Sequence, residues 1–262
     1  MPARSQNIMT VAQSKGHPLL LKAAPIICIL LALILWQLVS ALHIVQAYML
    51  PSPLATAKAF IGDFRLLCYH LVATLQEAVL GLLLSLLFAF VTALVMDSFA
   101  FVKAALYPLL VVTQTVPTIA IAPLLILWLG YGIAPKVALI VITCYFPLTI
   151  SLLTGFASAD CDTIKLLQSM GAHKKQIFTF VKVPASLPHF FSGLKISVSY
   201  SLIGAVISEW LGGMRGLGVY MIRVKKSYSF DKMFAVIFLI SALSLLLMKV
   251  TGLLEKKLSW ER

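Results

Sequence analysis

Six long apolar blocks, separated by short polar segments, run along the chain. Each is close to the roughly 20 residues that a helix needs to cross the hydrocarbon core of a bilayer, where the backbone must satisfy its own hydrogen bonds. The pattern predicts an all-α, polytopic membrane protein with six transmembrane helices. The expected spans are Ala23–Leu42, Leu71–Met96, a third from after Lys103 to Trp128, Val137–Ala159, Phe191–Gly213 and Met233–Leu254.

The third block is too long for one straight span. Uncharged residues continue from Ala104 to Pro135, and Pro108, Pro117 and Pro123 interrupt them. Proline removes a helical hydrogen bond and bends the helix at its position. We therefore expect one kinked span, followed by a turn at Gly130–Gly132.

Composition agrees with a membrane protein. Only 11% of the residues are charged and 61% are hydrophobic, whereas about a quarter of the residues of a soluble globular chain are charged. The formal net charge is +12, but the basic residues lie between the apolar blocks rather than along one helical face. Membrane topology and anionic lipid explain this placement, so we expect no nucleic-acid partner.

The blocks predict a single membrane domain whose two ends are cytoplasmic. More lysine and arginine residues fall on the inner segments if the N-terminus starts inside, as the positive-inside rule requires. The uncharged run Ala23–Leu42 exceeds the roughly 7–15 apolar residues of a signal-peptide core, so we expect an uncleaved first span. The expected organisation is a tail at 1–22, a six-span domain at 23–254 with a cytoplasmic loop at 160–188, and a tail at 255–262.

Motifs for metal binding and catalysis are missing from the sequence. The four cysteines, Cys28, Cys68, Cys144 and Cys161, have no CxxC spacing, and we interpret them as small buried hydrophobic residues. There is no HExxH motif and no G-x4-G-K-[ST] phosphate-binding loop. We predict a transport subunit that is not an enzyme and binds no cofactor or metal.

The loop at 160–188 is the longest polar segment on the inner side. Ile164, Leu167 and Met170 recur at helical spacing, and Gly171 interrupts the pattern. This arrangement predicts two short helices joined by a turn at the glycine. An amphipathic helix outside the membrane needs a cover, which would be the membrane surface or a partner protein.

This loop resembles the cytoplasmic loop of importer permeases of the ATP-binding-cassette (ABC) class, E-A-A-x3-G-x9-I-x-L-P. Here Gly171 is followed ten residues on by Val181-Lys182-Val183-Pro184, while Lys165-Leu166-Leu167 stands where the family has Glu-Ala-Ala. Other segments resemble the nitrate/sulfonate/taurine-type branch of these permeases. Their sequences look most like those of permeases for the hydroxymethylpyrimidine precursor of thiamine. They are Leu50–Pro53, Val116–Leu124, Glu209–Gly213 with Gly216–Gly218, and Leu258–Trp260.

The resemblance implies a type I importer permease in the inner (plasma) membrane that imports a thiamine precursor or a sulfonate-, taurine- or nitrate-like solute. It implies two ATPase subunits that hold ATP and Mg²⁺, a second permease copy, and a periplasmic or lipid-anchored solute-binding protein. The loop would dock on the ATPase; the alternative is a basic loop that only sets topology. The expected docking residues are Asp162, Lys165, Leu166, Leu167, Met170, Gly171, His173, Val181 and Pro184.

Polar residues in the third span are candidates for a solute pathway. Gln114, Thr115 and Thr118 flank Pro117, and Gln114 and Thr118 would share a helical face with Tyr107. Polar groups beside a proline within the membrane suit a path for a polar solute. The alternative is that these groups satisfy one another around the kink.

The fifth span offers three further candidates, Tyr200, Ser208 and Glu209. Glu209 is an intramembrane carboxyl near the outer end, which would belong to an outer gate or would hydrogen-bond the glycine-rich bend that follows. Ser208 ends a small-residue stripe that suits close helix packing or pore lining. The stripe is Gly193, Ser197, Ser201, Gly204 and Ser208. A stand-alone secondary transporter or channel is the second hypothesis, but no ionisable residue stands clearly at the midplane to couple ions.

Overall fold

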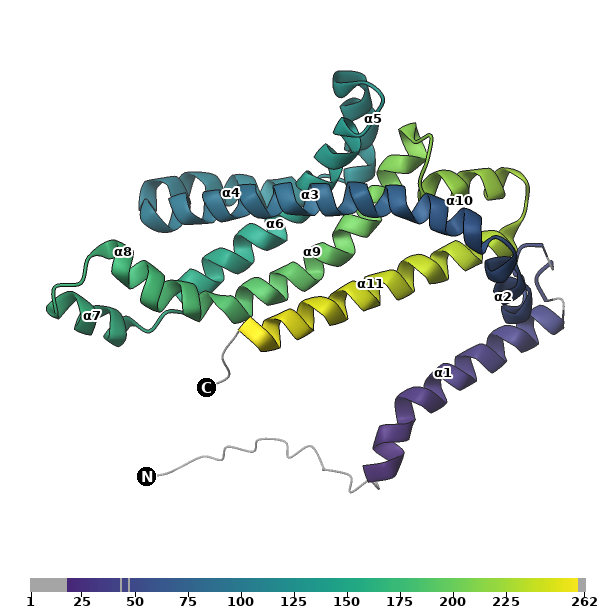
Figure 1. Cartoon of the computed structure of the whole chain (residues 1–262), viewed down its shortest axis with the longest axis horizontal. Coiled ribbons are helices and arrows are strands. Elements are labelled where there is room, and N and C mark those ends of the chain that lie inside the picture. Colours follow the sequence, from purple (N-terminus) through teal and green to yellow (C-terminus); the bar gives the residue numbers. More distant parts are fainter. Residues whose placement is uncertain (1–17, 43, 47, 259–262) are drawn as a thin grey trace, which may run out of the picture.

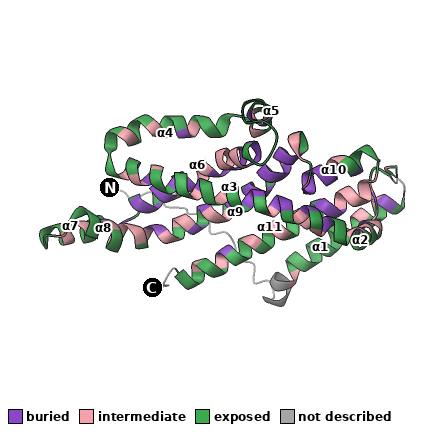
Figure 2. Ribbon diagram, turned by 45° about the horizontal axis from the view of Figure 1, so that its top comes forward, coloured by how far each residue is buried: buried purple, intermediate pink, exposed green. Residues whose placement is uncertain are grey.

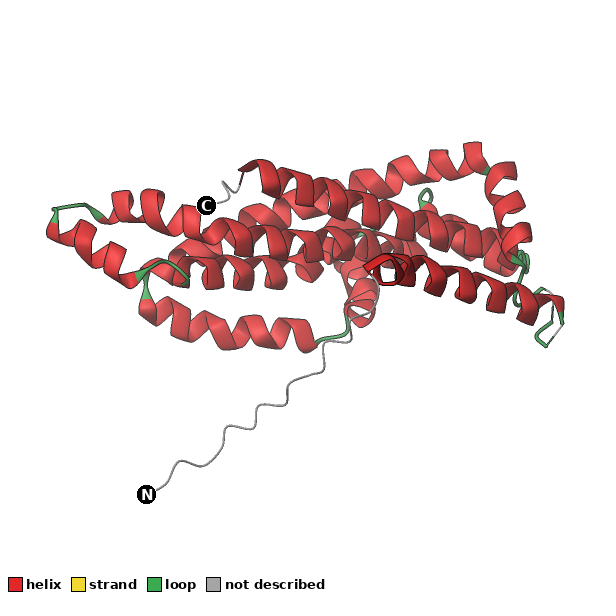
Figure 3. Cartoon of the chain, turned by 90° about the horizontal axis from the view of Figure 1, so that it is seen from below, coloured by secondary structure: helices red, strands yellow, loops and turns green. Residues whose placement is uncertain are grey.

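The computed structural model describes residues 18–42, 44–46 and 48–258, which form helices joined by short turns (Figure 3). Residues 1–17 of the predicted tail at 1–22, and residues 259–262 of the predicted tail at 255–262, lie outside the described residues. The latter include Ser259 and Trp260. The helices are α1 (Pro18–Ala41), α2 (Pro53–Gly62), α3 (Phe64–Ser98), α4 (Ala100–Thr115), α5 (Thr118–Leu129), α6 (Ala134–Ala157), α7 (Cys161–Ser169), α8 (Lys174–Ile177), the π-helical turn η1 (Phe178–Lys182), α9 (Val183–Gly212), α10 (Leu217–Lys226) and α11 (Phe230–Leu258).

The all-α polytopic architecture is confirmed. Five stretches among the described residues are long and apolar enough to cross a membrane, and the α4–α5 pair makes a sixth. The fifth span is longer than predicted, because α8, η1 and α9 form one helical rod over Lys174–Gly212. Two short helices, α2 and α10, were not predicted. Both lie at the end of the molecule opposite α7 (Figure 1).

The kink predicted in the third block is a sharp break between two helices. α4 and α5 meet at 98°, so α5 stands across the direction of α4 (Figure 1). Val116 and Pro117 are both extended, with ψ of 124° and 116°, because a proline disfavours the helical conformation of the residue before it. Pro108 and Pro123 lie inside helices without ending them. The predicted turn is confirmed, with positive φ at Gly130 and Gly132.

The core lies between α6 and α9, with α3 packed over both. Burial concentrates on these helices, whereas α1 and α4 are largely exposed (Figure 2). All members of the small-residue stripe on α9 are buried. A Cβ atom at Gly193 would overlap Ser151 on α6, and one at Gly204 would lie 3.3 Å from Ile140. The stripe therefore serves close helix packing, the first of its two predicted roles.

α1 contacts the remaining spans near its C-terminal half. Trp36 stacks on Phe234 and Phe238, with ring centroids 5.8 and 5.5 Å apart, and its Nε1–H donates to the Pro51 carbonyl at 3.0 Å. Most other apolar side chains of α1 are exposed, as expected for a helix that faces lipid.

The cysteine prediction holds in part. All four cysteines are free, and Cys144 is buried in the core, but Cys28 and Cys161 are exposed. Cys28 lies on the exposed helix α1, and Cys161 begins α7, so neither is a buried core residue. The expectation of burial was wrong for these two positions, because α1 is largely uncovered by other helices and the start of α7 is exposed.

Candidate functional site

The loop at 160–188 folds as two short helices around Gly171, as the sequence predicted. The Asp160 carboxylate caps α7 by accepting the backbone N–H groups of Asp162 and Thr163. At the other end, Gly171 N–H donates to Gln168 O at 3.0 Å and Ala172 N–H to Leu167 O at 2.9 Å. This pair of bonds is a Schellman motif, which needs a left-handed residue. Gly171 supplies it with φ of +84°.

The loop presents apolar side chains to its surroundings at one end of the molecule (Figure 1). Leu166 is 61% exposed, Met170 74% and Phe180 71%. Leu167 and Val181 are half-buried and face the rest of the chain. Phe180 was not among the predicted docking residues.

Polar contacts stabilise the conformation of the loop and leave its exposed apolar side chains uncovered. Lys165 pairs with Asp162 at 3.4 Å, and both side chains are exposed. His173 N–H donates to the Gln176 side chain at 2.8 Å and starts α8. Hydrogen bonds from the Thr163 hydroxyl and backbone hold the pKa of Asp160 below its ordinary value, so Asp160 is a carboxylate cap at neutral pH.

A hollow of about 580 Å³ opens where α4 breaks into α5, opposite α6 and α9. It brings together four predicted pathway residues, Gln114, Pro117, Thr118 and Tyr200. Its lining is Thr113, Gln114, Val116, Pro117, Thr118, Ile142, Thr143, Phe146, Pro147, Ile196, Tyr200 and Ile203, none of which is charged.

The remaining pathway candidates lie elsewhere. Tyr107 and Thr115 are on α4 but do not line the hollow, and the 98° break removes the shared helical face predicted for Tyr107, Gln114 and Thr118. The Thr115 hydroxyl donates to the Val112 carbonyl at 2.8 Å. Among the described residues, the side chains of Gln114, Thr118 and Tyr200 have no hydrogen-bond partner, so they do not satisfy one another around the proline.

Glu209 caps the start of α10. Its Oε2 accepts the Gly218 N–H at 2.6 Å, and its Oε1 accepts the Thr74 hydroxyl at 2.7 Å. The Leu217 N–H donates to Thr74 Oγ1 at 2.9 Å, and the Gly216 N–H to His70 Nδ1 at 3.1 Å. Helix N-termini leave such amides unpaired and favour negative charge. The hydrogen bond to the glycine-rich bend, predicted as one role of Glu209, is therefore present.

The glycines of that bend are required by the same contacts. Gly216 has φ of +137°, and a Cβ atom there would overlap the Glu209 carboxyl. A Cβ atom at Gly218 would overlap the Val206 carbonyl. With Glu209 only 1% exposed, its carboxyl is enclosed by α3, α9 and α10 and does not line the hollow at the α4–α5 break.

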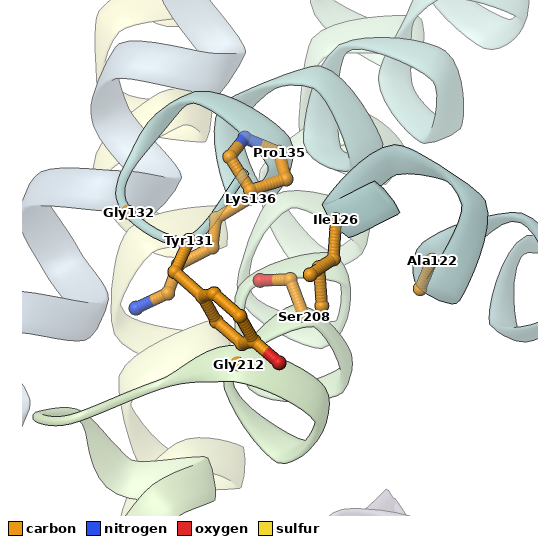
Figure 4. Close-up of a pocket in the computed structure, with 8 residues that line it drawn as sticks. All are labelled: Ala122, Ile126, Tyr131, Gly132, Pro135, Lys136, Ser208 and Gly212. Atoms are coloured by element: carbon orange, nitrogen blue, oxygen red, sulfur yellow. The ribbon is translucent and has the colours of Figure 1, made fainter. Parts of the chain in front are cut away.

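A buried ion pair joins α3 to α6 near this cap, and sequence reasoning missed it. Lys136 Nζ lies 2.5 Å from Glu77 Oε1, with both side chains less than 10% exposed. Lys136 lies just before the predicted fourth span, Val137–Ala159, so the sequence placed it outside the membrane. Together with Ser208 and Tyr131 it lines a hollow of about 10 Å³ (Figure 4), which is about the room one water needs. An unpaired buried charge is costly, and only this pairing makes Lys136 tolerable there.

Most of the chain is similar to known transport permeases. Residues 81–260 match the family model described as binding-protein-dependent transport system inner membrane component. A probable ABC transporter permease protein of Haemophilus influenzae is 38% identical over 85% of this chain and 91% of its own length. The formylaminopyrimidine transport permease protein ThiX of Halalkalibacterium halodurans is 39% identical over 85% and 89%. The taurine transport system permease protein TauC of Escherichia coli is 28% identical over 87% and 85%.

The fold is also found among solved structures. The crystal structure of an amino acid ABC transporter with histidines superposes with a TM-score of 0.65 and 17% sequence identity, over 76% of this chain and 97% of that one. At this identity the likeness concerns the fold alone.

Proposed function

The chain belongs to the family of binding-protein-dependent transport system inner membrane components, the permease subunits of ABC importers, and from this premise we propose that it moves a thiamine pyrimidine precursor inward through the hollow at the α4–α5 break. Energy would come from a separate ATPase docked on the loop around Gly171. The observation that carries the proposal is the loop itself, an exposed apolar surface at the end of the helical rod Lys174–Gly212.

Docking on an ATPase supplies the cover that the loop needs. Leu166 and Met170 lie one helical turn apart and are exposed, and paired apolar residues of this kind fit a groove on a partner protein. The rigid Schellman turn at Gly171 fixes the angle between α7 and the rod that follows. Closure of an ATPase dimer that binds one permease state more tightly would then shift the permease between states.

The complete importer requires further subunits. The hollow is open on one side, and apolar faces of α4 and α5 are exposed beside it, so a second permease copy would close it. Two ATPase subunits with ATP and Mg²⁺ and an external solute-binding protein complete the assembly. Both chain ends and the loop would lie on the cytoplasmic side of the plasma membrane, as the lysine and arginine distribution favours.

The lining of the hollow supports an uncharged ring as the solute. It offers an amide from Gln114, a hydroxyl from Thr118 and aromatic rings from Phe146 and Tyr200. An anion would lose its hydration there without meeting a cation, which is unfavourable in an apolar site. The name of the relative ThiX, a formylaminopyrimidine permease, points to the same class of solute. The taurine permease makes a sulfonate the second candidate.

The test is the assembled importer in proteoliposomes, with the wild-type chain compared with Gly171→Val. A β-branched residue at φ of +84° costs about 1–2 kcal/mol, which would distort the turn and weaken ATPase binding by roughly 5- to 30-fold. ATPase retained on purification, and ATP-dependent uptake of labelled hydroxymethyl-aminopyrimidine and labelled taurine, are measured together. We expect the wild type to accumulate the pyrimidine and the variant to lose both ATPase and uptake.

Gly62→Val is the matched control, because Gly62 ends α2 with open space around it and lies outside the loop. It should retain the ATPase and the uptake. Undiminished ATPase association of Gly171→Val would contradict docking through this turn. Uptake that proceeds without ATP would favour a stand-alone transporter, and a preference for taurine would replace the pyrimidine by a sulfonate.

A further inference from the structure

The inner end of α3 is tied to the docking segment by an ion pair. Lys182 Nζ lies 2.9 and 2.7 Å from the two carboxylate oxygens of Asp97. Their side chains are 25% and 19% exposed, so water screens this contact less than it screens the surface pair in α7. Lys182 is the last residue of η1, and Asp97 is one residue from the end of α3.

Lys182 stands where the docking loop turns into the membrane-spanning rod. The π-helical turn η1 packs against α8, α9 and α6, and Phe178 contacts Phe156 of α6 with ring centroids 5.2 Å apart. The ion pair adds a polar contact from this turn to α3. π-Helical turns inside helices are frequent at functional sites and at positions where a helix changes its course.

α3 leads from this contact to the other end of the molecule. Its 35 residues span about 50 Å at the helical rise of 1.5 Å per residue. Near that other end, Thr74 accepts a hydrogen bond from the first amide of α10, and Glu77 forms an ion pair with Lys136 of α6. A displacement of the inner end of α3 therefore acts on the elements that meet at the outer end.

Given the proposed function, on which this inference rests, we propose that the Asp97–Lys182 ion pair passes movement of the docking loop to α3. Lys182 and Asp97 are positioning residues that touch neither ATP nor solute. A charge-assisted pair has a defined geometry. It therefore resists separation of Lys182 from Asp97 as well as closer approach, whereas an apolar contact resists separation less. Loss of the pair leaves the loop docked while α3 follows it incompletely.

The test uses the assembled importer in proteoliposomes and measures solute moved per ATP hydrolysed. The double variant Asp97→Asn with Lys182→Met removes both charges, so no unpaired half-buried charge is left to disturb folding. We expect it to keep its ATPase and its basal ATP hydrolysis while the ratio falls by roughly threefold or more. The swapped variant Asp97→Lys with Lys182→Asp should recover at least half of the loss, since the charges pair again.

The double variant Lys195→Met with Glu255→Gln is the matched control, because it too removes both charges of a half-buried pair. Lys195 pairs with Glu255 at 2.5 Å and is 31% exposed, but the pair joins α9 to α11 rather than to α3. The ratio of solute moved to ATP hydrolysed should stay at the wild-type value in this control. The inference is overturned if Asp97→Asn with Lys182→Met keeps the wild-type ratio, or if the swapped variant is no better than that variant. An equal loss in Lys195→Met with Glu255→Gln overturns it as well. If the wild-type assembly itself shows no ATP-driven uptake, the proposed function fails instead.

Discussion

At the scale of single residues, Asp63 lies where four helices meet, at the end of the molecule that carries α2 and α10. Its carboxylate lies between α2 and α3, accepts the Tyr220 hydroxyl of α10 at 2.5 Å and pairs with Lys232 of α11 at 2.8 Å. The hydrogen bond from Lys232 and then that from Tyr220 hold the pKa of Asp63 below its ordinary value. Burial, with the Asp63 hydrogen bond, raises the pKa of Tyr220, which remains a phenol at neutral pH.

This pKa shift predicts a pH-dependent contribution to stability. Because the folded-state pKa of Asp63 lies below the unfolded value of 3.8, its ionised form stabilises the fold above that pH, and the contribution is lost as the pH falls through the folded-state pKa. Asp63→Asn should therefore unfold at a lower temperature than the wild type at pH 7, and the difference should shrink toward zero as the pH falls from 3.8 through the folded-state pKa of Asp63. Tryptophan fluorescence in detergent measures the unfolding temperature.

Asp162→Asn serves as the control, since the ion pair of Asp162 with Lys165 is exposed and exposed pairs contribute little. Its unfolding temperature should follow the wild type at every pH. A constant gap between Asp63→Asn and the wild type from pH 7 to acid would mean that the carboxylate acts through shape rather than charge.

At the scale of elements, the contact between α6 and α9 depends on side-chain size. Gly193 lies so close to Ser151 that an added methyl group would overlap it, whereas a methyl group at Gly252 of α11 would lie 3.7 Å from the nearest atom, on Lys195. Gly193→Ala should destabilise the protein by about 1–3 kcal/mol through overpacking. Gly252→Ala should be neutral or stabilising by up to about 1 kcal/mol, because alanine favours the helix.

Reversible unfolding of the two alanine variants in detergent, followed by circular dichroism, compares them directly. Both change glycine to alanine inside a long helix, so the difference between them isolates the α6–α9 contact. Equal stabilities would show that α6 moves aside at no cost.

The broken span illustrates what element-level patterns can predict. Three prolines marked the third block as irregular, but only Pro117 ends a helix. Pro108 and Pro123 are accommodated within α4 and α5, where each removes one backbone hydrogen bond. Which proline breaks the helix depends on whether the residue before it becomes extended, and the packing of α5 against α6 and α9 decides this at Val116.

At the scale of the whole molecule, the loop around Gly171 and helix α10 lie at opposite ends of the spans (Figure 1). Cys161 begins α7 and is a free, exposed thiol, so it reports on the side of the membrane that the loop occupies. In cells carrying a variant whose single cysteine is Cys161, a membrane-impermeant maleimide should label it only after permeabilisation. Labelling is measured by gel shift.

A cysteine-free background with Gly62→Cys provides the opposite control, because Gly62 is exposed at the end of α2 on the other side. This thiol should be labelled in intact cells. Labelling of Cys161 without permeabilisation would reverse the predicted orientation, and with it the assignment of the loop to a cytoplasmic ATPase.

The sequence by itself determined the features that depend on neighbouring residues. Apolar blocks predicted the spans, the positions of glycine predicted the turns at Gly130–Gly132 and Gly171, and the pattern around Gly171 predicted the family. These features are local. Each span needs apolar side chains of its own against lipid, and each turn needs a residue that can adopt its backbone conformation.

Only the tertiary structure decided which distant polar groups meet. Glu77 pairs with Lys136, Asp97 with Lys182, and Glu209 caps α10 together with Thr74. Inside a membrane a polar side chain needs a partner, but the partner depends on the rotation and depth of each helix in the bundle. Packing of α3, α6 and α9 sets these, and no pattern within one helix contains them.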